Sequence, residues 1–254
     1  LDALGGSRIF STLDLARGFH QQVVDPESRS KTAFATRRGL WEWTRLPFGV
    51  KNGPASFQRL MQFVLQNLCW KCCLLYLDDI IVYSKSFDAH LVHLQDVFDA
   101  LRKAGLRVRS EKCHFGAHSI SYLGHVISPE GIRVDPQNVR SVQEFARPQT
   151  YRQMRRFLGM VNYHRRFIAR YAALTAPLND LLKNPADPKK LQPLGWSDKA
   201  EESFGALKVA LTRAPLLAYP DYSRPFTLAT DASAVATGAS LFQRDSDGNL
   251  CPVA

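Results

Sequence analysis

The sequence has no apolar run that approaches the roughly 20 residues of a membrane-spanning helix, and no secretory signal pattern opens it. Cysteine is scarce, with five residues, an odd number. Without a secretory signal, this usage favours reduced thiols in an intracellular compartment over a disulfide framework. Cys69 and Cys72 form a C-x-x-C pattern, but no second pair stands at the spacing of a zinc finger. We therefore expect no membrane contact, and zinc binding is a minor alternative.

The 254 residues, 45% of them hydrophobic, suffice for one large domain or for two or three small ones. The chain begins at Leu1 rather than at Met, and it ends on "CPVA" just after a strand-like start. We therefore interpret it as part of a longer protein. No pattern in the sequence fixes an oligomeric state.

Positive charge is unevenly distributed. The chain has 33 basic and 23 acidic residues, a formal net charge of +10. Residues 131–190 hold 12 Lys or Arg against 4 Asp or Glu, a net charge of +8. Such a basic block favours a polyanionic partner, most often nucleic acid. A solvated helical surface is the alternative, and charge alone does not separate the two.

Residues 1–128 alternate between strand-like and helical patterns. We expect a strand from Arg8 to about Leu15 and a hairpin over residues 32–49 that turns at residues 37–39. Pro54 is placed to begin a helix, and a second helix should end at Gly105. This order predicts an α+β layer in which helices cover one face of an antiparallel sheet. The expected apolar faces of the helices are Phe57, Leu60, Met61, Val64, Leu65 and Leu68, then Leu91, Leu94, Val97, Phe98 and Leu101.

After residue 128 the pattern becomes more helical. Thr150 and Gln153 are spaced as a capping box. The Pro-rich stretch "NPADPKKLQP", residues 184–193, reads as a linker. A later helix leads to "RPFTLATDAS", a strand that ends in Asp231. The apolar stripes expected for the two helices are Met154, Phe157, Leu158 and Val161, then Phe204, Leu207 and Leu211.

Two adjacent acids interrupt the apolar run "CCLLYLDDIIVYS" at residues 72–84. Burying neighbouring carboxylates without cations is costly, so a tight turn between two strands should carry Asp78 and Asp79 at its tip. Asp14 likewise follows the strand-like run "RIFSTL". If these strands are neighbours, the three carboxylates converge on one point, and carboxylate oxygens are ligands that Mg²⁺ prefers. Ordinary turn residues are the alternative, which the apolar context disfavours.

Five motifs occur in the order and spacing of a reverse transcriptase, namely "STLDLARGFHQ", "TRLPFGVKNGPASFQRLM", "YLDDIIVYS", "LRKAGLRVRSEKCHF" and "SYLGHVIS". The sequence resembles the gypsy class of LTR retrotransposons, and the resemblance continues through "FLGMVNYHRRFI" into "FTLATDAS". It implies an RNA-directed DNA polymerase that uses two Mg²⁺ ions, or Mn²⁺, with an RNA template, a DNA primer and deoxynucleoside triphosphates. It also implies four regions: a palm with part of the fingers (1–128), a basic helical thumb (129–190), a connection (191–224) and a truncated RNase H-like domain (225–254).

The resemblance implies chemical roles for individual residues. Asp14 and Asp78 would be the principal metal ligands, with Asp79 supporting the second ion. Phe19, five residues after Asp14, resembles the steric gate that excludes a ribose 2′-hydroxyl; a core aromatic is the alternative. Lys112 resembles the lysine that protonates the leaving pyrophosphate; a surface lysine is the alternative.

The resemblance also implies contacts with nucleotide and nucleic acid. Phe48 and Gly49 lie in a loop similar to one that contacts the incoming nucleotide, and Gln58 contacts either template or only solvent. The primer grip would comprise Leu123, Gly124 and His125. The basic block would hold duplex phosphates without reading sequence, through Arg152, Arg155, Arg156, Arg165 and Arg166.

Two histidines and one further acid complete the candidate residues. His90 and His93 stand three apart on a helix with no further ligand, and we interpret them as surface residues. Asp231 resembles the first catalytic acid of an RNase H domain. The remaining acids of that domain are absent from this chain, so we expect RNase H activity of the parent protein only. The resemblance implies a cytoplasmic location in virus-like particles, or the nucleus.

Two other functions compete with the polymerase. A relic that binds nucleic acid without catalysis is the main alternative, although the presence of all three palm acids argues against it. A viral RNA polymerase is the second, and both Phe19 and the RNase H-like start favour deoxynucleotides instead. Nucleotide incorporation separates the polymerase from the relic, because both bind nucleic acid.

Overall fold

The computed structural model describes residues 1–183, 194–232, 237–245 and 247–253. The chain forms two compact units that divide between Tyr122 and Leu123, except that Asp2 groups with the second unit. The linker expected at residues 184–193 lies outside the described residues. No helix within the described ranges is long and apolar enough to cross a membrane.

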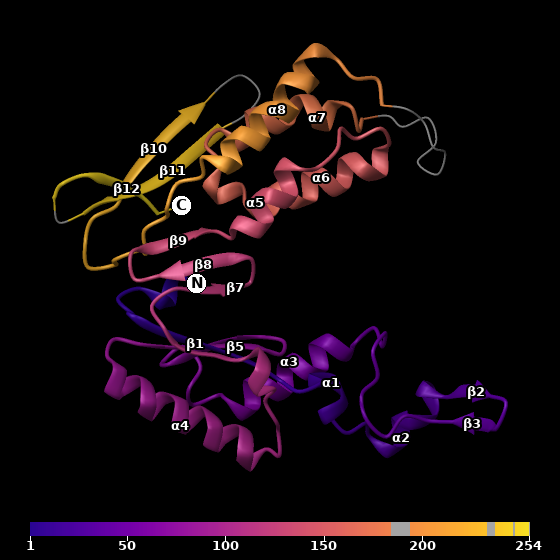
Figure 1. The fold of residues 1–254 in the computed structure, drawn as a ribbon. Helices are drawn as coiled ribbons and strands as arrows, with labels where there is room; N and C mark the ends of the chain where they lie inside the picture. The colour runs from indigo at the N-terminus through magenta and orange to yellow at the C-terminus, as the bar shows by residue number, and fades with distance from the viewer. Residues whose placement is uncertain (184–193, 233–236, 246, 254) are drawn as a thin grey trace. The chain divides into compact units, whose positions relative to one another are not determined.

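A four-stranded antiparallel sheet forms the centre of the first unit (Figure 1). Its strands lie in the order β4 (Cys73–Tyr76), β5 (Asp79–Ser84), β1 (Ile9–Asp14) and β6 (His114–Ala117). Strand β5 pairs on both sides, and the side chains of Ile80, Ile81 and Val82 are fully buried. Such β-branched residues suit a central strand because they pack well on a pleated surface. The predicted antiparallel sheet is confirmed.

Helices α3 (Gly53–Val64) and α4 (Phe87–Lys103) pack against this sheet. Pro54 lies in the first turn of α3, and Gly105 follows α4 with a positive φ of 69°, as the sequence predicts. Most of the predicted apolar faces are buried in the shared core. Leu91 is an exception, because 52% of it is exposed.

The position that α4 buries in place of Leu91 is His90, so the interpretation of the two histidines as surface residues is wrong. His90 has no solvent exposure, and its ring bonds to Ser11 Oγ at 2.7 Å and to Ser84 Oγ at 2.8 Å. The half-buried His93 bonds to the same Ser84 Oγ at 2.7 Å. Serine partners on β1 and β5 satisfy these rings, and a buried polar group with its hydrogen bonds made is stable.

Short elements connect the core of the first unit. A small hairpin, β2 (Phe34–Thr36) with β3 (Gly39–Trp41), lies where the sequence predicts one, and Arg37 and Arg38 form its turn. All six of its strand residues are exposed. The other short elements are η1 (Asp2–Leu4), α1 (Gly18–Gln21), α2 (Pro26–Arg29), η2 (Ser30–Thr32), η3 (Ser110–Lys112) and β7 (Ile120–Tyr122).

The second unit is mainly helical in its first part. Strands β8 (His125–Ser128) and β9 (Gly131–Val134) form an antiparallel pair that leads to α5 (Pro136–Gln143). Helix α6 (Tyr151–Tyr163) begins with the predicted capping box, and its predicted stripe is buried. Further along lie η4 (Arg165–Phe167), α7 (Tyr171–Asp180), α8 (Asp198–Thr212), β10 (Thr227–Ala232), β11 (Thr237–Arg244) and β12 (Leu250–Pro252).

Candidate active site

Strand pairing brings the three palm acids to one end of the first sheet. Asp14 is the last residue of β1 and lies directly opposite Asp79, the first residue of β5. Tyr76 pairs with Asp79, so Leu77 and Asp78 form a two-residue turn between β4 and β5. The predicted hairpin with acids at its tip is confirmed, and Asp14 joins them from a position more than sixty residues away.

The turn is held in place by residues from outside the hairpin. Leu77 has a φ of 57°, a left-handed conformation that costs an ordinary residue about 1–2 kcal/mol. Its N–H donates to Gln58 Oε1 on α3 at 2.6 Å. On the β5 side, the Tyr122 hydroxyl donates to the Asp79 carbonyl at 3.2 Å. The half-buried Gln58 therefore fixes the turn that carries Asp78.

Gly18 packs against the same turn. A Cβ at this position would lie 3.1 Å from the Phe57 ring and 3.2 Å from the Asp78 Cβ, which is too close for ordinary contact. A side chain here would have to displace either the ring or the acid. Sequence reasoning missed Gly18 and Tyr122, since neither carries a signal apart from its place in a motif.

The pKa of Asp79 reflects burial and repulsion by the neighbouring acids. The pKa of Asp79 is raised above its ordinary value, first by desolvation, then by Asp78 and then by Asp14. The positive charge of Lys112 acts to lower the pKa of Asp79. The Lys112 Nζ lies 3.4 Å from Asp14 Oδ2. Asp14 is one-quarter exposed, so solvent screens this ion pair. A cation at this end of the sheet would relieve the repulsion.

The donor set fits magnesium but does not enclose an ion. Within the described ranges, no three His, Cys, Asp or Glu side chains lie close enough to hold one ion. The sequence predicts convergence on one point; the structure brings the acids to one end of the sheet without closing them into a cluster. Like charges repel when no cation lies between them. Mg²⁺ commonly binds one or two carboxylates together with waters and substrate phosphates, so the arrangement fits.

An aromatic group adjoins the acids. The Phe19 ring on α1 lies 5.5 Å from the ring of Phe48 and 5.3 Å from that of Phe57. Phe19 is half-buried, whereas 68% of Phe48 is exposed. Gly49 has a φ of 88°, which suits glycine, and its Cβ position faces open space. The loop that carries Phe48 and Gly49 is thus next to Phe19.

The residues expected as a primer grip open the second unit. Leu123 and Gly124 are half-buried and have positive φ angles of 47° and 71°. Tyr163 and Asn138 hold their backbone, donating to the carbonyls of Leu123 at 2.7 Å and Gly124 at 3.2 Å. His125 is 7% exposed and its side chain does not face solvent. Of the three expected primer-grip residues, Leu123 and Gly124 are therefore the more accessible.

The His125 ring is part of an aromatic cluster. It stacks on Tyr163 and Phe167, each at 5.5 Å between ring centroids. Burial, followed by the neighbouring His164, lowers the pKa of His125 to about 4. The ring is therefore neutral at pH 7, and its Nδ1 has no hydrogen-bond partner among the described residues.

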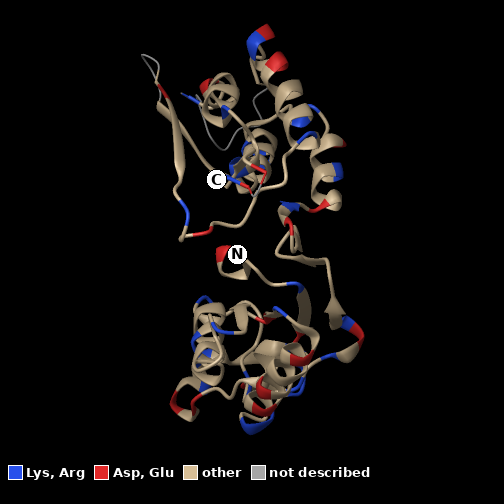
Figure 2. Ribbon diagram, turned by 90° about the vertical axis from the view of Figure 1, so that its left-hand side faces the viewer, with Lys and Arg blue, Asp and Glu red and all other residues tan. Residues whose placement is uncertain are grey.

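The five arginines expected to hold nucleic acid phosphates lie on α6 and η4, and all of them are exposed. Arg152 and Arg155 form no ion pair with any described residue, which leaves their guanidinium groups available. Figure 2 shows basic and acidic positions interspersed along the ribbon of both units. Asp231 lies on the exposed strand β10, opposite Gly238.

A family model described as "Reverse transcriptase (RNA-dependent DNA polymerase)" matches residues 1–127, half of the chain. The chain belongs to the reverse transcriptase family. A second model, described as an RNase H-like domain found in reverse transcriptase, matches residues 196–254 of this reverse transcriptase. The reverse transcriptase and RNase H-like identities inferred from the motifs are confirmed, and the bounds of the four regions stay a prediction.

Similar proteins come from retrotransposons. The Pol polyprotein of transposon 297 from Drosophila melanogaster is 42% identical over 96% of this reverse transcriptase chain. The gypsy polyprotein of the same species is 37% identical over 94%, and the Tf2-3 polyprotein of Schizosaccharomyces pombe is 34% identical over 100%. The chain spans 22%, 24% and 18% of these relatives' own lengths.

Solved structures of the foamy viral protease-reverse transcriptase share the fold. One, in complex with double-stranded DNA, matches 97% of this chain and 42% of its own with a TM-score of 0.83 and 25% identity. Another, in complex with an RNA/DNA hybrid, matches 100% of this chain and 34% of its own with a TM-score of 0.81 and 25% identity. The α+β fold expected from the sequence is confirmed.

Proposed function

We propose that this chain is the polymerase part of a retrotransposon Pol polyprotein and adds deoxynucleotides to a DNA primer on an RNA template. The observation that carries the proposal is the placement of Asp14, Asp78 and Asp79 at one end of one sheet, where, after desolvation, Asp78 and Asp14 both contribute to raising the pKa of Asp79. The names of the relatives and the nucleic acids bound by the structural neighbours support it.

The reaction exchanges one phosphorus–oxygen bond for another. The primer 3′-oxygen loses its proton and bonds to the α-phosphorus, while the bond from that phosphorus to the β-phosphate oxygen breaks and pyrophosphate leaves. Mg²⁺, or Mn²⁺ in its place, would when bound supply stabilisation of negative charge on the attacking and leaving oxygens. Asp14 and Asp78 would hold the two ions, with Asp79 supporting the second. Lys112, whose Nζ lies 3.4 Å from Asp14 Oδ2, would give a proton to the pyrophosphate.

Other residues select and orient the substrates. Phe19, held between Phe48 and Phe57, would exclude a ribose 2′-hydroxyl, and Phe48 with Gly49 would contact the nucleotide. The backbone at residues 123–124 would position the primer end. The exposed arginines of the second unit would hold duplex phosphates. We assign Asp231 to the RNase H activity of the parent polyprotein, and for that polyprotein we propose a cytoplasmic location in virus-like particles, or the nucleus.

Primer extension with the Asp78→Asn variant tests the proposal. We expect incorporation of deoxynucleotides on an RNA template to fall by a factor of at least about 100, because several kcal/mol of transition-state stabilisation is lost. Asp96→Asn is the matched control, since Asp96 is an exposed acid on α4. Normal extension by Asp78→Asn would refute the assigned roles. If the wild-type chain bound the hybrid but incorporated no nucleotide, the inactive binding protein would be the better description.

A further inference from the structure

The proposed gate residue Phe19 lies on α1, a helix of four residues. A single helical turn is not stable by itself in water, so contacts with other segments must fix its position. At its beginning, the buried Gly18 lies against the Phe57 ring and the Asp78 Cβ. This packing fixes the start of α1, and the place of its end depends on other contacts.

The side chain of Gln21, the last residue of α1, forms three hydrogen bonds with backbone groups. Its Nε2 donates to the Ala16 carbonyl at 2.8 Å and to the Arg107 carbonyl at 2.9 Å. Its Oε1 accepts from the Arg107 N–H at 2.7 Å. A glutamine amide offers two N–H donors and one oxygen acceptor, and Gln21 uses all of them here. The half-buried amide thus pairs with both backbone groups of a residue 86 positions away.

Arg107 belongs to a segment that continues the antiparallel pairing of β1 beyond Asp14. The Ala16 N–H donates to the Arg107 carbonyl at 2.9 Å. Two residues further along, the Arg109 N–H donates to the Asp14 carbonyl at 2.8 Å. Gln21 therefore ties the end of α1 to a segment that is itself bonded to a proposed metal ligand.

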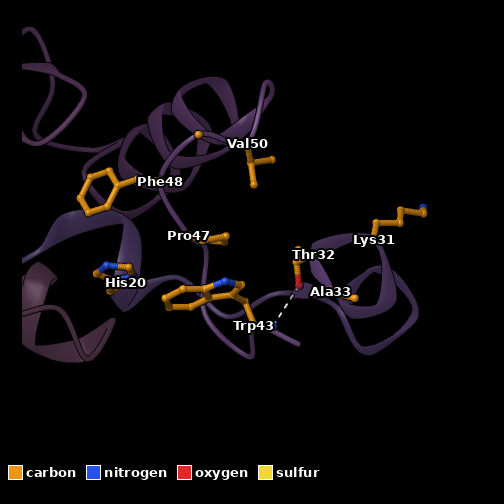
Figure 3. A pocket seen from close by; sticks show the side chains of 9 residues that line it. His20, Lys31, Thr32, Ala33, Trp43, Pro47, Phe48 and Val50 are labelled. Carbon is orange, nitrogen blue, oxygen red and sulfur yellow. Dashed lines mark hydrogen bonds between the residues drawn. The ribbon is translucent and has the colours of Figure 1, made fainter. Parts of the chain in front are cut away.

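Another flank of α1 borders a pocket of about 410 Å³, which His20 lines together with Trp43 and Phe48 (Figure 3). The His20 ring stacks on Trp43 with centroids 5.6 Å apart, and it meets Phe48 edge-on at 5.0 Å. The exposed Arg45 donates to the Gln21 carbonyl at 2.7 Å. Because a pocket rather than a packed core lies on this flank, α1 depends more on the bonds that the Gln21 amide forms.

We propose that Gln21 is a positioning residue, which fixes Phe19 relative to the proposed metal ligands and thereby sets the discrimination between deoxyribose and ribose. The inference rests on the proposed polymerase function. Gln21 acts through the Phe19 ring, two residues before it on the same helical turn, and does not itself contact the substrate. Such support matters because a functional group must be held within about 0.5 Å of its productive place.

Single-nucleotide primer extension by the full chain tests this role. The measured quantity is kcat/KM for a deoxynucleotide divided by kcat/KM for the matching ribonucleotide. Gln21→Met keeps the length of the side chain without its hydrogen bonds. We expect it to lower the ratio about tenfold, within the roughly 10–200-fold by which a pocket discriminates over one small group. A merely structural loss would reduce the active fraction and leave the ratio unchanged, and an unchanged ratio would overturn the inference.

Two further variants sharpen the test. Gln62→Met makes the same change at an exposed position of α3 and should leave the ratio unchanged. Phe19→Ala removes the gate, and adding Gln21→Met to it should alter the ratio by less than about twofold, because the two residues act as one unit. An equal tenfold loss from Gln21→Met with and without the Phe19 ring would show that Gln21 does not act through Phe19.

Hydrogen exchange separates this inference from the polymerase proposal. In Gln21→Met, the amides of residues 18–22 and 107 should exchange faster than in the wild-type chain, and those of the β4–β5 hairpin should not. If the wild-type chain extends primers but the ratio does not respond to Gln21→Met, the role of Gln21 fails and the polymerase stands. If no primer is extended, the polymerase proposal fails. Faster exchange would then still support the placement of α1 by Gln21, and unchanged exchange would refute it.

Discussion

Two hairpins of the first unit have the same connection but different surroundings. Arg37 and Arg38 join β2 to β3, and Leu77 and Asp78 join β4 to β5, each as a two-residue turn. The strand residues of the first hairpin are all exposed, whereas five of the six β5 residues are buried. An isolated two-stranded hairpin is marginally stable in water. The sheet and α3 therefore fix the conformation of the acid-bearing turn, whereas the exposed hairpin has no buried strand residues to fix its conformation.

The difference matches the task of the buried hairpin, which carries Asp78 and Asp79. Metal ligands must be held within fractions of an ångström, and this precision comes from packed neighbours such as Gln58 and Gly18. The β2–β3 hairpin has no comparable support, because all of its strand residues are exposed.

The largest effect should come from shortening a core side chain of the buried hairpin. Ile81→Ala removes fully buried methyl groups from β5 and should lower the free energy of unfolding by about 2–5 kcal/mol. Leu40→Ala makes a similar change on β3, where 71% of the residue is exposed, and should cost less than about 0.5 kcal/mol. Urea unfolding measures both. Equal costs would contradict the contrast between the hairpins.

A smaller effect is expected at the support of the acidic turn. Gln58→Ala leaves the Leu77 N–H without its acceptor and should destabilise the chain by about 1–3 kcal/mol. Mn²⁺ binding, followed by electron paramagnetic resonance, should weaken as well, because Asp78 is less well fixed. Gln62→Ala, an exposed change one turn further along α3, serves as the control. Unchanged Mn²⁺ affinity in Gln58→Ala would show that the turn keeps its conformation without the Gln58 side chain.

Acid should weaken the buried sheet through His90. Burial, followed by the nearby His93, lowers the pKa of His90 below its ordinary value of 6.5. The unfolded chain then binds a proton that the folded chain does not, so stability is full above pH 6.5 and falls as the pH decreases below it. Urea midpoints measured on both sides of this pH should show the loss. His90→Asn should have a shallower dependence, and an unchanged slope would exclude His90 as the source.

The smallest global effect should come from the turn of the exposed hairpin. Gly39 has a φ of 127°, which side-chain-bearing residues rarely adopt, and Gly39→Ala should therefore loosen β2 and β3. Because these strands add little to the core, the midpoint of global unfolding should barely move. Hydrogen exchange should instead report faster exchange confined to residues 34–41. A large shift of the global midpoint would mean that this hairpin stabilises the unit.

Much of the fold follows from the sequence because periodicity and turn signals are local. The acids between two apolar runs predicted the β4–β5 hairpin, and Thr150 with Gln153 predicted the start of α6. Leu91 shows where this logic fails. Its spacing suits the apolar face of α4, yet His90 is buried in its place because Ser11 on β1 and Ser84 on β5 bond to its ring.

The sequence predicted which residues belong to the candidate site, but it did not predict the contacts that hold them. The motifs identified Asp14 and Asp78, and the pairing of β1 and β4 with β5 then brought them to one end of the sheet. No local pattern shows that Gln58 accepts from Leu77 or that the His125 side chain is buried among aromatic rings. Such contacts depend on where other elements lie in space, which spacing along one segment does not reveal.

The limited space at Gly18 links two tasks that we assign to different residues, the selection of the sugar and the binding of metal. The residue precedes Phe19 in the chain, and a Cβ on it would lie 3.1 Å from the Phe57 ring, which packs against Phe19, and 3.2 Å from the Asp78 Cβ. A side chain at residue 18 would therefore disturb both the ring beside the proposed sugar gate and a proposed metal ligand. One substitution there would alter discrimination between sugars and the efficiency of bond formation together.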